Sequence, residues 1–476
     1  MKKFKKIIIP IIIAVVLTVS SIFVYYNYFY DSNKLSIKEK EWINNNANRV
    51  ISFGIPANLN NFSKSGNGIF YDFTKDLADE YKVKINNNSY TSFDNSLGFY
   101  ITDKENASDL LFYKDFYVLV SKNDKVVTDI NKIKDTKVGT LSDYSSFLTS
   151  NTTFSGTISI AINRENLLKD FETNYDYLFV PLNEYLDEIV SNNYKVVYQF
   201  ENIPIYYYLH LGTDTTFNRV VTKYYNEWMI NSFDTYYYKH LFSLYKTELS
   251  LTDLEVDSFN KNVYSFGFVT KSPIISGNSS KIGGIVAEYI KEFSKLTNTE
   301  FKYIAYKNNS DLEKAYNNKK INLLFNDTTN YDNTIKTNIS EEFAIISNNK
   351  DSDFYANLNM INNRNVCVIE NSNLFGYLSS FSNINIEKVK NEQKLIRCLK
   401  KNKLVAIDEY TLKYYSNDLI KDYHVAYSGY NINNFSFKYN NNEDAFYKVF
   451  SSYINTLGNK EMMVKGLTSY EKISNV

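Results

Sequence analysis

The chain has 476 residues, enough for two to four domains, and its 44% hydrophobic and 22% charged content favours packed globular domains over extended disorder. Its 53 lysines plus arginines balance 53 aspartates plus glutamates, so the net charge is zero. This balance argues against a broad basic surface for nucleic acid.

The amino terminus has the pattern of a membrane anchor. Four lysines within residues 1–6 precede an uncharged run at 7–24 and a tyrosine-rich cluster at 25–30. An apolar span of about 18–20 residues fits a transmembrane helix, and the preceding lysines place the amino terminus in the cytoplasm. We therefore predict a cytoplasmic tail at 1–6, a single-pass signal anchor at 7–30, and an extracellular chain from about residue 31. A cleaved signal peptide is the alternative.

The cysteine content gives no sign of a metal centre. Cys367 lies in a predicted strand and Cys398 in a predicted helix, without a CxxC motif or a Cys/His spacing suited to zinc. A disulfide would require their Cα atoms to lie within roughly 7 Å. We expect two free, buried thiols rather than a disulfide, and no metal or cofactor.

A short motif occurs twice. Residues 180–185 and 405–410 share the form V-x-(aliphatic)-(N/D)-E-Y, and each follows an apolar run. Each predicts a buried strand with polar residues at its carboxyl end. Small ligands bind at that edge of open α/β sheets, which makes Asp408, and its counterpart Asn183, candidate ligand contacts.

The rest of the chain repeats around this motif. Co-linear matches pair Ser36-x-x-Glu39 with Thr252-x-x-Glu255, 52–55 with 265–268, Gly68 with Gly284, and 115–119 with 342–346. The Ser36 and Thr252 segments are capping boxes, each typical of a helix start. The matches predict two tandem domains of similar fold, 35–250 and 251–476.

Within each half, strands and helices alternate, which predicts parallel sheets covered on both faces. Return strands at 205–211 and 435–439 would join two lobes by two crossovers, a geometry that makes a hinge and a cleft. The second half has a predicted helix at 311–316, where the first has only an Asn- and Ser-rich stretch at 86–97. We expect the first domain to lack that helix.

This pattern resembles the type II periplasmic solute-binding fold, specifically the tandem Venus-flytrap domains of bacterial sensor proteins, similar to extracellular solute-binding protein family 3. The residues that carry the resemblance are the leader 35–42, the strand 49–55 and the glycine-led helix 68–78. The resemblance covers about residues 35–476. It implies an α/β fold of two tandem bilobal domains, each with two doubly wound lobes and a hinge, after one transmembrane helix.

The resemblance also bears on the ligand. Family members that bind amino acids have an acid at the end of a second-lobe strand, a position that Asp408 occupies and where the first domain has Asn183. They also have an arginine for the ligand carboxylate, a task that a bidentate guanidinium suits. No arginine lies between residues 321 and 343 or between 97 and 116. In this respect the sequence departs from the family pattern. Because Asp408 is present only in the second half, the resemblance implies that the second domain binds the ligand, an amino-acid-like or other small polar solute.

Further candidate contacts follow other predicted strands. Asp327, Thr328 and Thr329 could offer a carboxylate and hydroxyls, or form a plain turn. Asn371 and Ser372 precede a helix whose backbone N–H groups could hold an anion. Thr140 and Ser142 are, with Asn183, the weaker counterparts in the first domain. Asp408 itself could instead cap the following helix.

Known catalytic motifs are missing from the sequence. It has no HExxH, GxSxG, phosphate loop or dinucleotide fingerprint, so we expect no enzyme activity. We expect a sensory module that binds a solute and signals by cleft closure to an output domain or partner outside this chain, such as a diguanylate cyclase or a histidine kinase. A homodimer is compatible with this hypothesis. The alternatives are the substrate-binding component of an ABC-type transporter, which would serve a permease, and a ligand-free surface scaffold.

Overall fold

The computed structural model describes residues 34–470, with gaps at 124–126, 128–129, 152–153, 272, 327–333, 341, 349–352, 371, 417–422, 430–433, 442–443 and 457–464. The predicted tail at 1–6 and anchor at 7–30 lie outside the described residues. Within the described part of the chain, no helix is long and apolar enough to cross a membrane.

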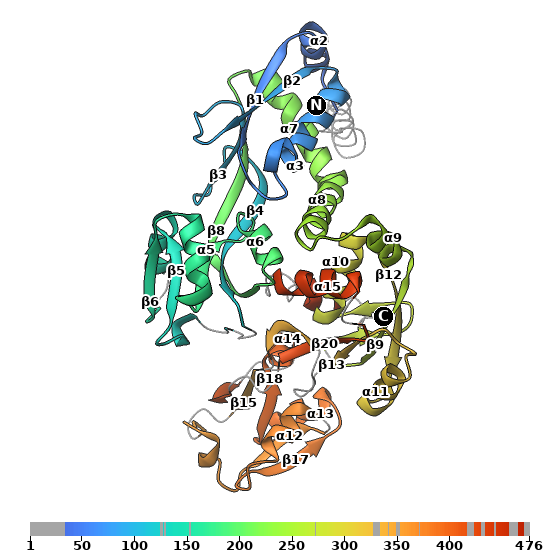
Figure 1. Ribbon diagram of the computed structural model, residues 1–476. Helices are drawn as coiled ribbons and strands as arrows, with labels where there is room; N and C mark the ends of the chain where they lie inside the picture. Colours follow the sequence, from blue (N-terminus) through green and yellow to red (C-terminus); the bar gives the residue numbers. More distant parts are fainter. Residues whose placement is uncertain are drawn as a thin grey trace, which may run out of the picture. The chain divides into compact units, whose positions relative to one another are not determined.

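The chain divides into two compact units (Figure 1). The first unit comprises Met1–Lys114 and Tyr206–Tyr237, and the second comprises Asp115–Ile205 and Tyr238–Val476. These units group the chain differently from the predicted domains 35–250 and 251–476, which follow the sequence repeat and remain a prediction.

The first unit packs helices against the strands β1, β2 and β3. Its elements are α2 (Ile37–Asn46), β1 (Val50–Pro56), α3 (Ile69–Tyr81), β2 (Lys84–Tyr90), β3 (Gly98–Thr102), α7 (Thr215–Asn231), the start of β4 (Leu110–Ser121), the end of β8 (Lys195–His210) and the start of α8 (Phe233–Glu248). Its core is aromatic: Phe73 packs against Phe99, Phe112 and Trp228 at centroid distances of 5.2–5.8 Å. The predicted capping box is confirmed, because Ser36 and Glu39 satisfy each other's backbone N–H groups.

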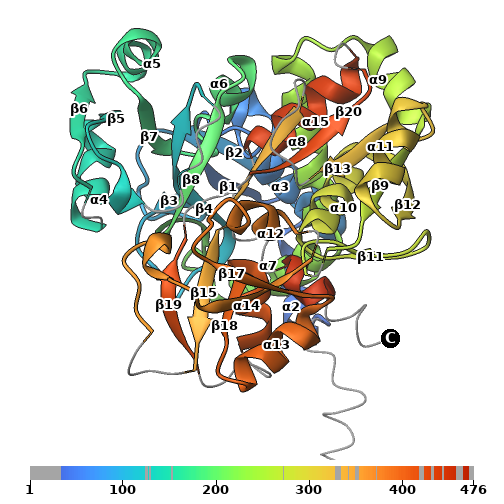
Figure 2. The ribbon, with the colours of Figure 1, turned by 90° about the horizontal axis from the view of Figure 1, so that it is seen from below.

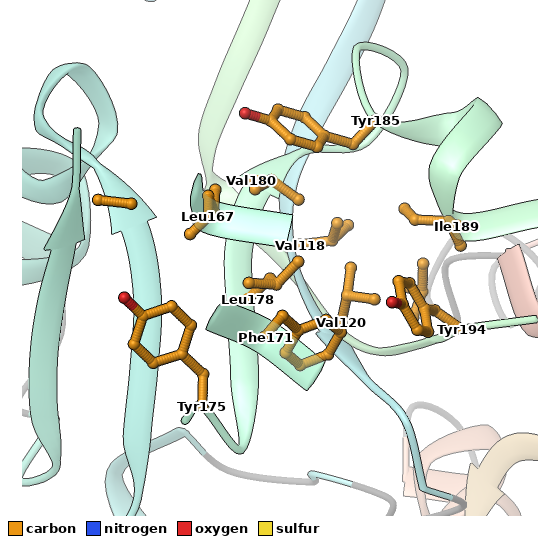
Figure 3. Packing of buried hydrophobic residues seen from close by; sticks show 12 residues of the cluster. Val118, Val120, Leu167, Phe171, Tyr175, Leu178, Val180, Tyr185, Ile189 and Tyr194 are labelled. Atoms are coloured by element: carbon orange, nitrogen blue, oxygen red, sulfur yellow. The ribbon is translucent and has the colours of Figure 1, made fainter. Parts of the chain in front are cut away.

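The second unit contains three sets of strands. The set from Asp115–Ile205 comprises β5 (Lys137–Leu141), α4 (Ser142–Asn151), β6 (Thr157–Ala161), α5 (Arg164–Thr173), β7 (Tyr177–Pro181), α6 (Leu186–Ser191) and parts of β4 and β8. Its core joins Val118 and Val120 of β4 to Leu178 and Val180 of β7, with Phe171 of α5 packed on them (Figure 3).

The other two sets are the five-stranded sheets of the C-terminal half, here called lobe A and lobe B. Lobe A comprises α9 (Asp253–Lys261), β9 (Val263–Val269), α10 (Ile285–Thr297), β12 (Glu300–Tyr306), α11 (Asn309–Asn317), β13 (Leu323–Asn326), β14 (Thr334–Ser340), β20 (Asn434–Tyr439), α15 (Ala445–Thr456), and a two-stranded ribbon, β10 (Ser276–Gly277) and β11 (Ile282–Gly283). Lobe B comprises β15 (Phe343–Ser347), β16 (Asn365–Ile369), α12 (Asn373–Leu378), β17 (Asn385–Val389), α13 (Glu392–Lys400), β18 (Leu404–Asp408), α14 (Glu409–Ser416) and β19 (His424–Ser428). Helices α12, α13 and α14 contact the strands of lobe B (Figure 2).

Strand order confirms the repeat. The N-terminal half has the order β2-β1-β3-β8-β4-β7-β5-β6. Its first four strands match β12-β9-β13-β20 of lobe A, and the other four, taken from the far edge, match β17-β16-β18-β15 of lobe B. The helix predicted at 311–316 is α11, and no helix occurs at residues 91–97 between β2 and β3, so the missing helix of the first half is also confirmed.

The prediction of parallel sheets was wrong in one respect. The eight-stranded sheet and the two five-stranded sheets each contain both parallel and antiparallel strand pairs. The crossover strands run opposite to their neighbours: β3 pairs antiparallel with β8, β13 with β20, and β15 with β18. A strand that carries the chain from one lobe to the other enters its sheet in the reverse direction. Other pairs, such as β9 with β12 and β16 with β17, are parallel.

The expectation of two free thiols was wrong as well. Cys367 of β16 and Cys398 of α13 form a disulfide, with their Cα atoms 6.4 Å apart. Helix α13 packs its Leu395 into the same apolar cluster as Val405 of β18, which brings the two cysteines together. A carboxylate oxygen of Glu387 lies near the two sulfurs, and cysteine and glutamate are both common metal ligands. Cysteine binds a metal as a thiolate, however, and these two sulfurs are bonded to each other.

Candidate functional site

A cavity of about 530 Å³ is lined by residues from both lobe A and lobe B. Its lining segments follow the carboxyl ends of β9 and β12 in lobe A and of β16, β17 and β18 in lobe B. These are the strand ends at which open α/β sheets bind ligands. Its volume lies within the range of about 300–1,000 Å³ that is usual for small-molecule sites.

Lobe A contributes a basic wall to the cavity. Lys271 follows β9, with its Nζ 5.0 Å from the centroid of the Phe435 ring, and the exposed Lys307 follows β12. Beside Lys307, the Asn308 side chain caps α11 by accepting a hydrogen bond from the Asp311 N–H at 2.9 Å. Among the described lining residues, lobe A presents two lysines and no acid.

Lobe B contributes a mainly acidic wall. Glu370 follows β16, Glu392 is the first residue of α13, and Asp408 is the last residue of β18. Lys390 follows β17 and is the one basic residue of this wall among the described lining residues. The Asn391 side chain caps α13, accepting from the Lys394 N–H at 3.1 Å.

One acid of lobe B, Glu392, is harder to ionise than an ordinary glutamate. Burial raises the pKa of Glu392, and the neighbouring negative charge of Asp408 raises it further. Among the described residues, neither Lys307 nor Lys390 forms an ion pair with an acid. The cavity therefore offers carboxylates that a bound cation would stabilise and ammonium groups that a bound anion would stabilise.

Two residues predicted from sequence lie on the cavity wall. Asp408 also caps α14, because its Oδ1 accepts from the Thr411 N–H at 2.9 Å, so the two alternatives for this residue are compatible. Ser372 caps the short helix α12, accepting from the Phe375 N–H at 3.0 Å and donating to the Ile369 carbonyl at 2.7 Å. The ligand contacts predicted at Asp327, Thr328, Thr329 and Asn371 lie outside the described residues.

The first-half counterparts have other contacts. The Thr140 hydroxyl is fully buried and donates to the Phe179 carbonyl at 2.8 Å. Ser142 is exposed at the start of α4, where it donates to Asp143 Oδ1 at 3.1 Å. Asn183 is buried, and its backbone N–H donates to Asp115 Oδ2 at 3.1 Å. A ligand role for these three residues remains a prediction.

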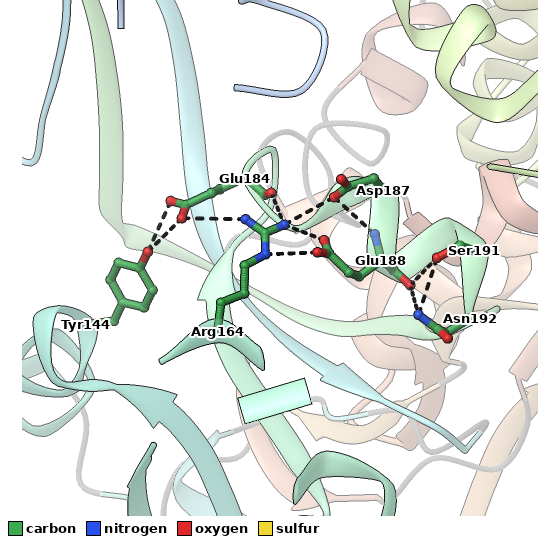
Figure 4. Close-up of polar contacts among 7 residues, drawn as sticks. All are labelled: Tyr144, Arg164, Glu184, Asp187, Glu188, Ser191 and Asn192. Carbon is green, nitrogen blue, oxygen red and sulfur yellow. Dashed lines mark hydrogen bonds and ion pairs between the residues drawn. The ribbon is translucent and has the colours of Figure 1, made fainter. Parts of the chain in front are cut away.

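The first half instead has an internal ion-pair network at this position (Figure 4). Arg164 donates to the two carboxylate oxygens of Glu188 at 2.8 and 2.5 Å and to the Glu184 carbonyl at 2.8 Å. Its guanidinium lies 4.2 Å from the centroid of the Tyr185 ring, and the Tyr144 hydroxyl donates to Glu184 Oε1 at 3.0 Å. Burial raises the pKa of Glu188 to about 7 despite the guanidinium.

Arg164 and Glu392 occupy corresponding positions in the two halves. Each is the first residue of the helix that follows an edge strand, and each follows an asparagine that caps that helix, Asn163 or Asn391. Glu392 faces the cavity in lobe B, whereas Arg164 in the first half pairs with the neighbouring acids Glu184, Asp187 and Glu188. The acids that follow β7 therefore pair with an arginine of the same half.

Sequence reasoning missed Lys307, Lys390, Glu370 and Glu392. A signal for the lysines was present, because the dipeptide Lys-Asn follows both β12 and β17 and precedes a helix each time. Lysine is common in this chain, so a single lysine after a strand is a weak signal, and the resemblance indicates an arginine for the ligand carboxylate.

No family model and no curated protein matches the sequence. The periplasmic domain of BvgS from Bordetella pertussis is 12% identical, with 92% of this chain and 93% of that chain covered and a TM-score of 0.36. A structure described as VC protein is 11% identical (87% and 99% covered, TM-score 0.48). The GluR0 ligand-binding core from Nostoc punctiforme, in complex with (L)-glutamate, is 16% identical (45% and 100% covered, TM-score 0.34).

The repeated strand order of the two halves is what supports the predicted resemblance to tandem Venus-flytrap domains of the type II solute-binding fold. The chain is a mixed α/β protein whose C-terminal half has two lobes and a shared cavity.

Proposed function

We propose that the chain is a membrane-anchored, extracytoplasmic sensory module and that the cavity of lobes A and B binds its small solute. One observation carries the proposal: a single cavity of about 530 Å³ is lined by loops from two separate sheets, with charged side chains on both walls. A solute that contacts both walls stabilises the arrangement in which they are close together.

The connections between the lobes support closure as the signal. The chain passes from lobe A to lobe B after β14 and returns before β20, and these two strands pair with each other in lobe A. Two adjacent crossovers are the construction expected of a hinge between lobes. Solute binding would shift the population toward the closed form, and an output domain or partner outside this chain, such as a diguanylate cyclase or a histidine kinase, would respond.

The location of the module is proposed from two features. The sequence at 7–30 has the length and flanking charges of a signal anchor, with the tail 1–6 in the cytoplasm. The Cys367–Cys398 disulfide suits an oxidising compartment outside the cytoplasm.

A thermal-shift screen of the full-length chain against amino acids, short peptides and nucleobases tests this function. At least one solute is expected to raise the melting temperature, with an affinity that falls in Asp408→Asn. Asparagine caps a helix about as well as aspartate does, so this variant removes the charge while keeping the cap. The matched control is Asp214→Asn, which changes another helix-capping aspartate, that of α7. The proposal is wrong if no solute stabilises the chain or if Asp408→Asn binds as the wild type does.

A further inference from the structure

A short helical segment, residues 465–470, contacts both lobes of the C-terminal half and is here called the clasp. It contacts lobe A through Gly466 and Ser469, and it contacts lobe B through Tyr470. None of these residues lines the cavity. The contacts of the clasp therefore act on the arrangement of the two lobes and not on a solute directly.

The clasp is attached to lobe A at the start of α10. The Gly284 backbone N–H donates to Ser469 Oγ at 3.1 Å, and the Ser469 hydroxyl donates to the Gly466 carbonyl at 3.0 Å. The first N–H groups of a helix have no partner within the helix, so Ser469 supplies an acceptor that α10 lacks there. Gly466 is buried against α10, because a Cβ added to it would lie 2.3 Å from the Ile285 Cα.

The last residue of the clasp, Tyr470, is attached to lobe B. Its ring meets the Tyr414 ring edge to face, with the ring centroids 5.0 Å apart, and only 8% of Tyr470 is exposed. Aromatic pairs in this geometry contribute to stability beyond the apolar area that they bury. The Tyr470 ring thus joins the segment that is held by lobe A to helix α14 of lobe B.

Helix α14 connects this contact to the cavity. Asp408 lines the cavity and caps α14 by accepting from the Thr411 N–H. Tyr410, one turn before Tyr414, packs against Phe435 of lobe A, with the ring centroids 6.3 Å apart. Residues that are four apart lie on the same face of a helix, so one face of α14 contacts both lobe A and the clasp.

We propose that the clasp holds lobe B in the arrangement in which both lobes line one cavity, with Tyr470 as the positioning residue. This inference deepens the proposed function and rests on it for the role of lobe closure, but its test needs no solute. A contact stabilises the arrangement in which it occurs, so release of the clasp shifts the population toward other lobe arrangements. The clasp would thereby adjust the affinity of the cavity without touching the solute.

Distances between labels on the two lobes test the proposal in the full-length chain. Nitroxide labels are attached at Lys302→Cys in lobe A and Lys401→Cys in lobe B, two exposed positions outside the cavity lining. Their separation is measured by double electron–electron resonance without added solute. The native cysteines form a disulfide and so do not take the label. A second label pair, Lys302→Cys with Lys314→Cys, lies within lobe A and reports on the fold of that lobe.

Two variants release the clasp at its two attachments. Tyr470→Ala removes the ring contact with lobe B, and Gly466→Ala places a Cβ against Ile285 of lobe A. Each is expected to lower the population with the wild-type lobe distance, relative to other distances, by about 2- to 10-fold, the factor that one aromatic pair supplies. The double variant should shift no further than either single variant, because both changes act through the same segment.

Tyr377→Ala is the matched control. It removes a tyrosine ring that packs against Phe343 and Phe381, both of lobe B, and it should keep the wild-type distance between the lobes. In all three variants, the label pair within lobe A should keep its wild-type distance.

The outcomes separate the clasp from the proposed function. An unchanged distance between the lobes in both Tyr470→Ala and Gly466→Ala overturns the clasp, and so does a shift of equal size in Tyr377→Ala. Broadening of the label pair within lobe A in both variants also overturns it, because the segment would then support the fold of lobe A and not the position of lobe B. These results involve no solute, so the proposed function is overturned only by its own screen.

Discussion

Reduction of the Cys367–Cys398 disulfide is expected to destabilise lobe B. The bond closes a loop between residues that are 31 apart in sequence. The chain-entropy relation for a loop of this length gives about 3.7 kcal/mol of stability at 25 °C, lost when the cross-link opens. Because the bond joins β16 to α13, and the cavity residues Glu370 and Glu392 lie at the ends of these elements, reduction should also weaken solute binding.

Thiol counting and thermal unfolding check this prediction. The purified chain, denatured without reductant, should show no reactive thiol, and reductant should lower its melting temperature. A Cys367→Ala/Cys398→Ala double variant is the control, because its melting temperature should not respond to reductant. Two reactive thiols in the unreduced protein, or equal melting with and without reductant, would refute the reasoning.

Three further predictions concern the network, a helix start and the cavity. Arg164→Met should lower the local opening free energy of residues 164–192, measured by hydrogen exchange, by about 1–3 kcal/mol, a value discounted because the arginine is 34% exposed. Burial raises the pKa of Glu188 to about 7, so the folded state holds this proton more tightly than the unfolded state does, and wild-type stability should fall as the pH rises from about 4.5 to 7. The loss in Arg164→Met should therefore be larger at pH 8 than at pH 5. Gly284→Ala should lower the melting temperature by several degrees, because this residue has a φ of 109° and its new Cβ would lie 2.5 Å from the Ile274 carbonyl oxygen. The control is Gly376→Ala, whose new Cβ would meet nothing within 4 Å, so this variant should be neutral or stabilising. Burial and the charge of Asp408 raise the pKa of Glu392, so this carboxylate should become protonated at a higher pH than an ordinary glutamate does. As the solution is acidified, the affinity of the cavity for a cationic group, measured by calorimetry, should therefore begin to fall at that higher pH.

Each of these predictions has a result that contradicts it. An equal loss at both pH values would show that Arg164 does not offset ionised carboxylates. Equal melting of Gly284→Ala and Gly376→Ala would show that the left-handed backbone at Gly284 is not required. An affinity that stays constant between pH 7 and pH 4 would remove Glu392 and its neighbours from the binding site.

Local patterns in the sequence predicted much of the fold. The capping boxes at Ser36 and Thr252 and the glycine-led helices after Gly68 and Gly284 were confirmed, because each depends on side chains or backbone angles within a few residues. The repeat and the missing helix were likewise predicted, because hydrophobic periodicity carries that information. Strand direction was not predicted correctly, since the crossover strands obtain their partners from distant parts of the chain.

The candidate site was predicted less completely than the fold. Asp408 and Ser372 were placed at strand ends from sequence, and both line the cavity. The charged residues Lys307 and Glu392 were not predicted. They lie in different lobes, and only the folded structure shows that both line the same cavity. The disulfide was missed for a similar reason: the sequence does not give the distance between Cys367 and Cys398.

Hydrogen exchange of the full-length chain, with and without a saturating solute from the screen, tests the central claim most directly. Binding in the cavity of lobes A and B predicts slower exchange in the segments that line it, at 269–271, 307–309, 368–374, 390–395 and 406–411. Protection confined to the corresponding first-half segments, at 140–144 and 183–188, or no protection at saturation, would contradict the account.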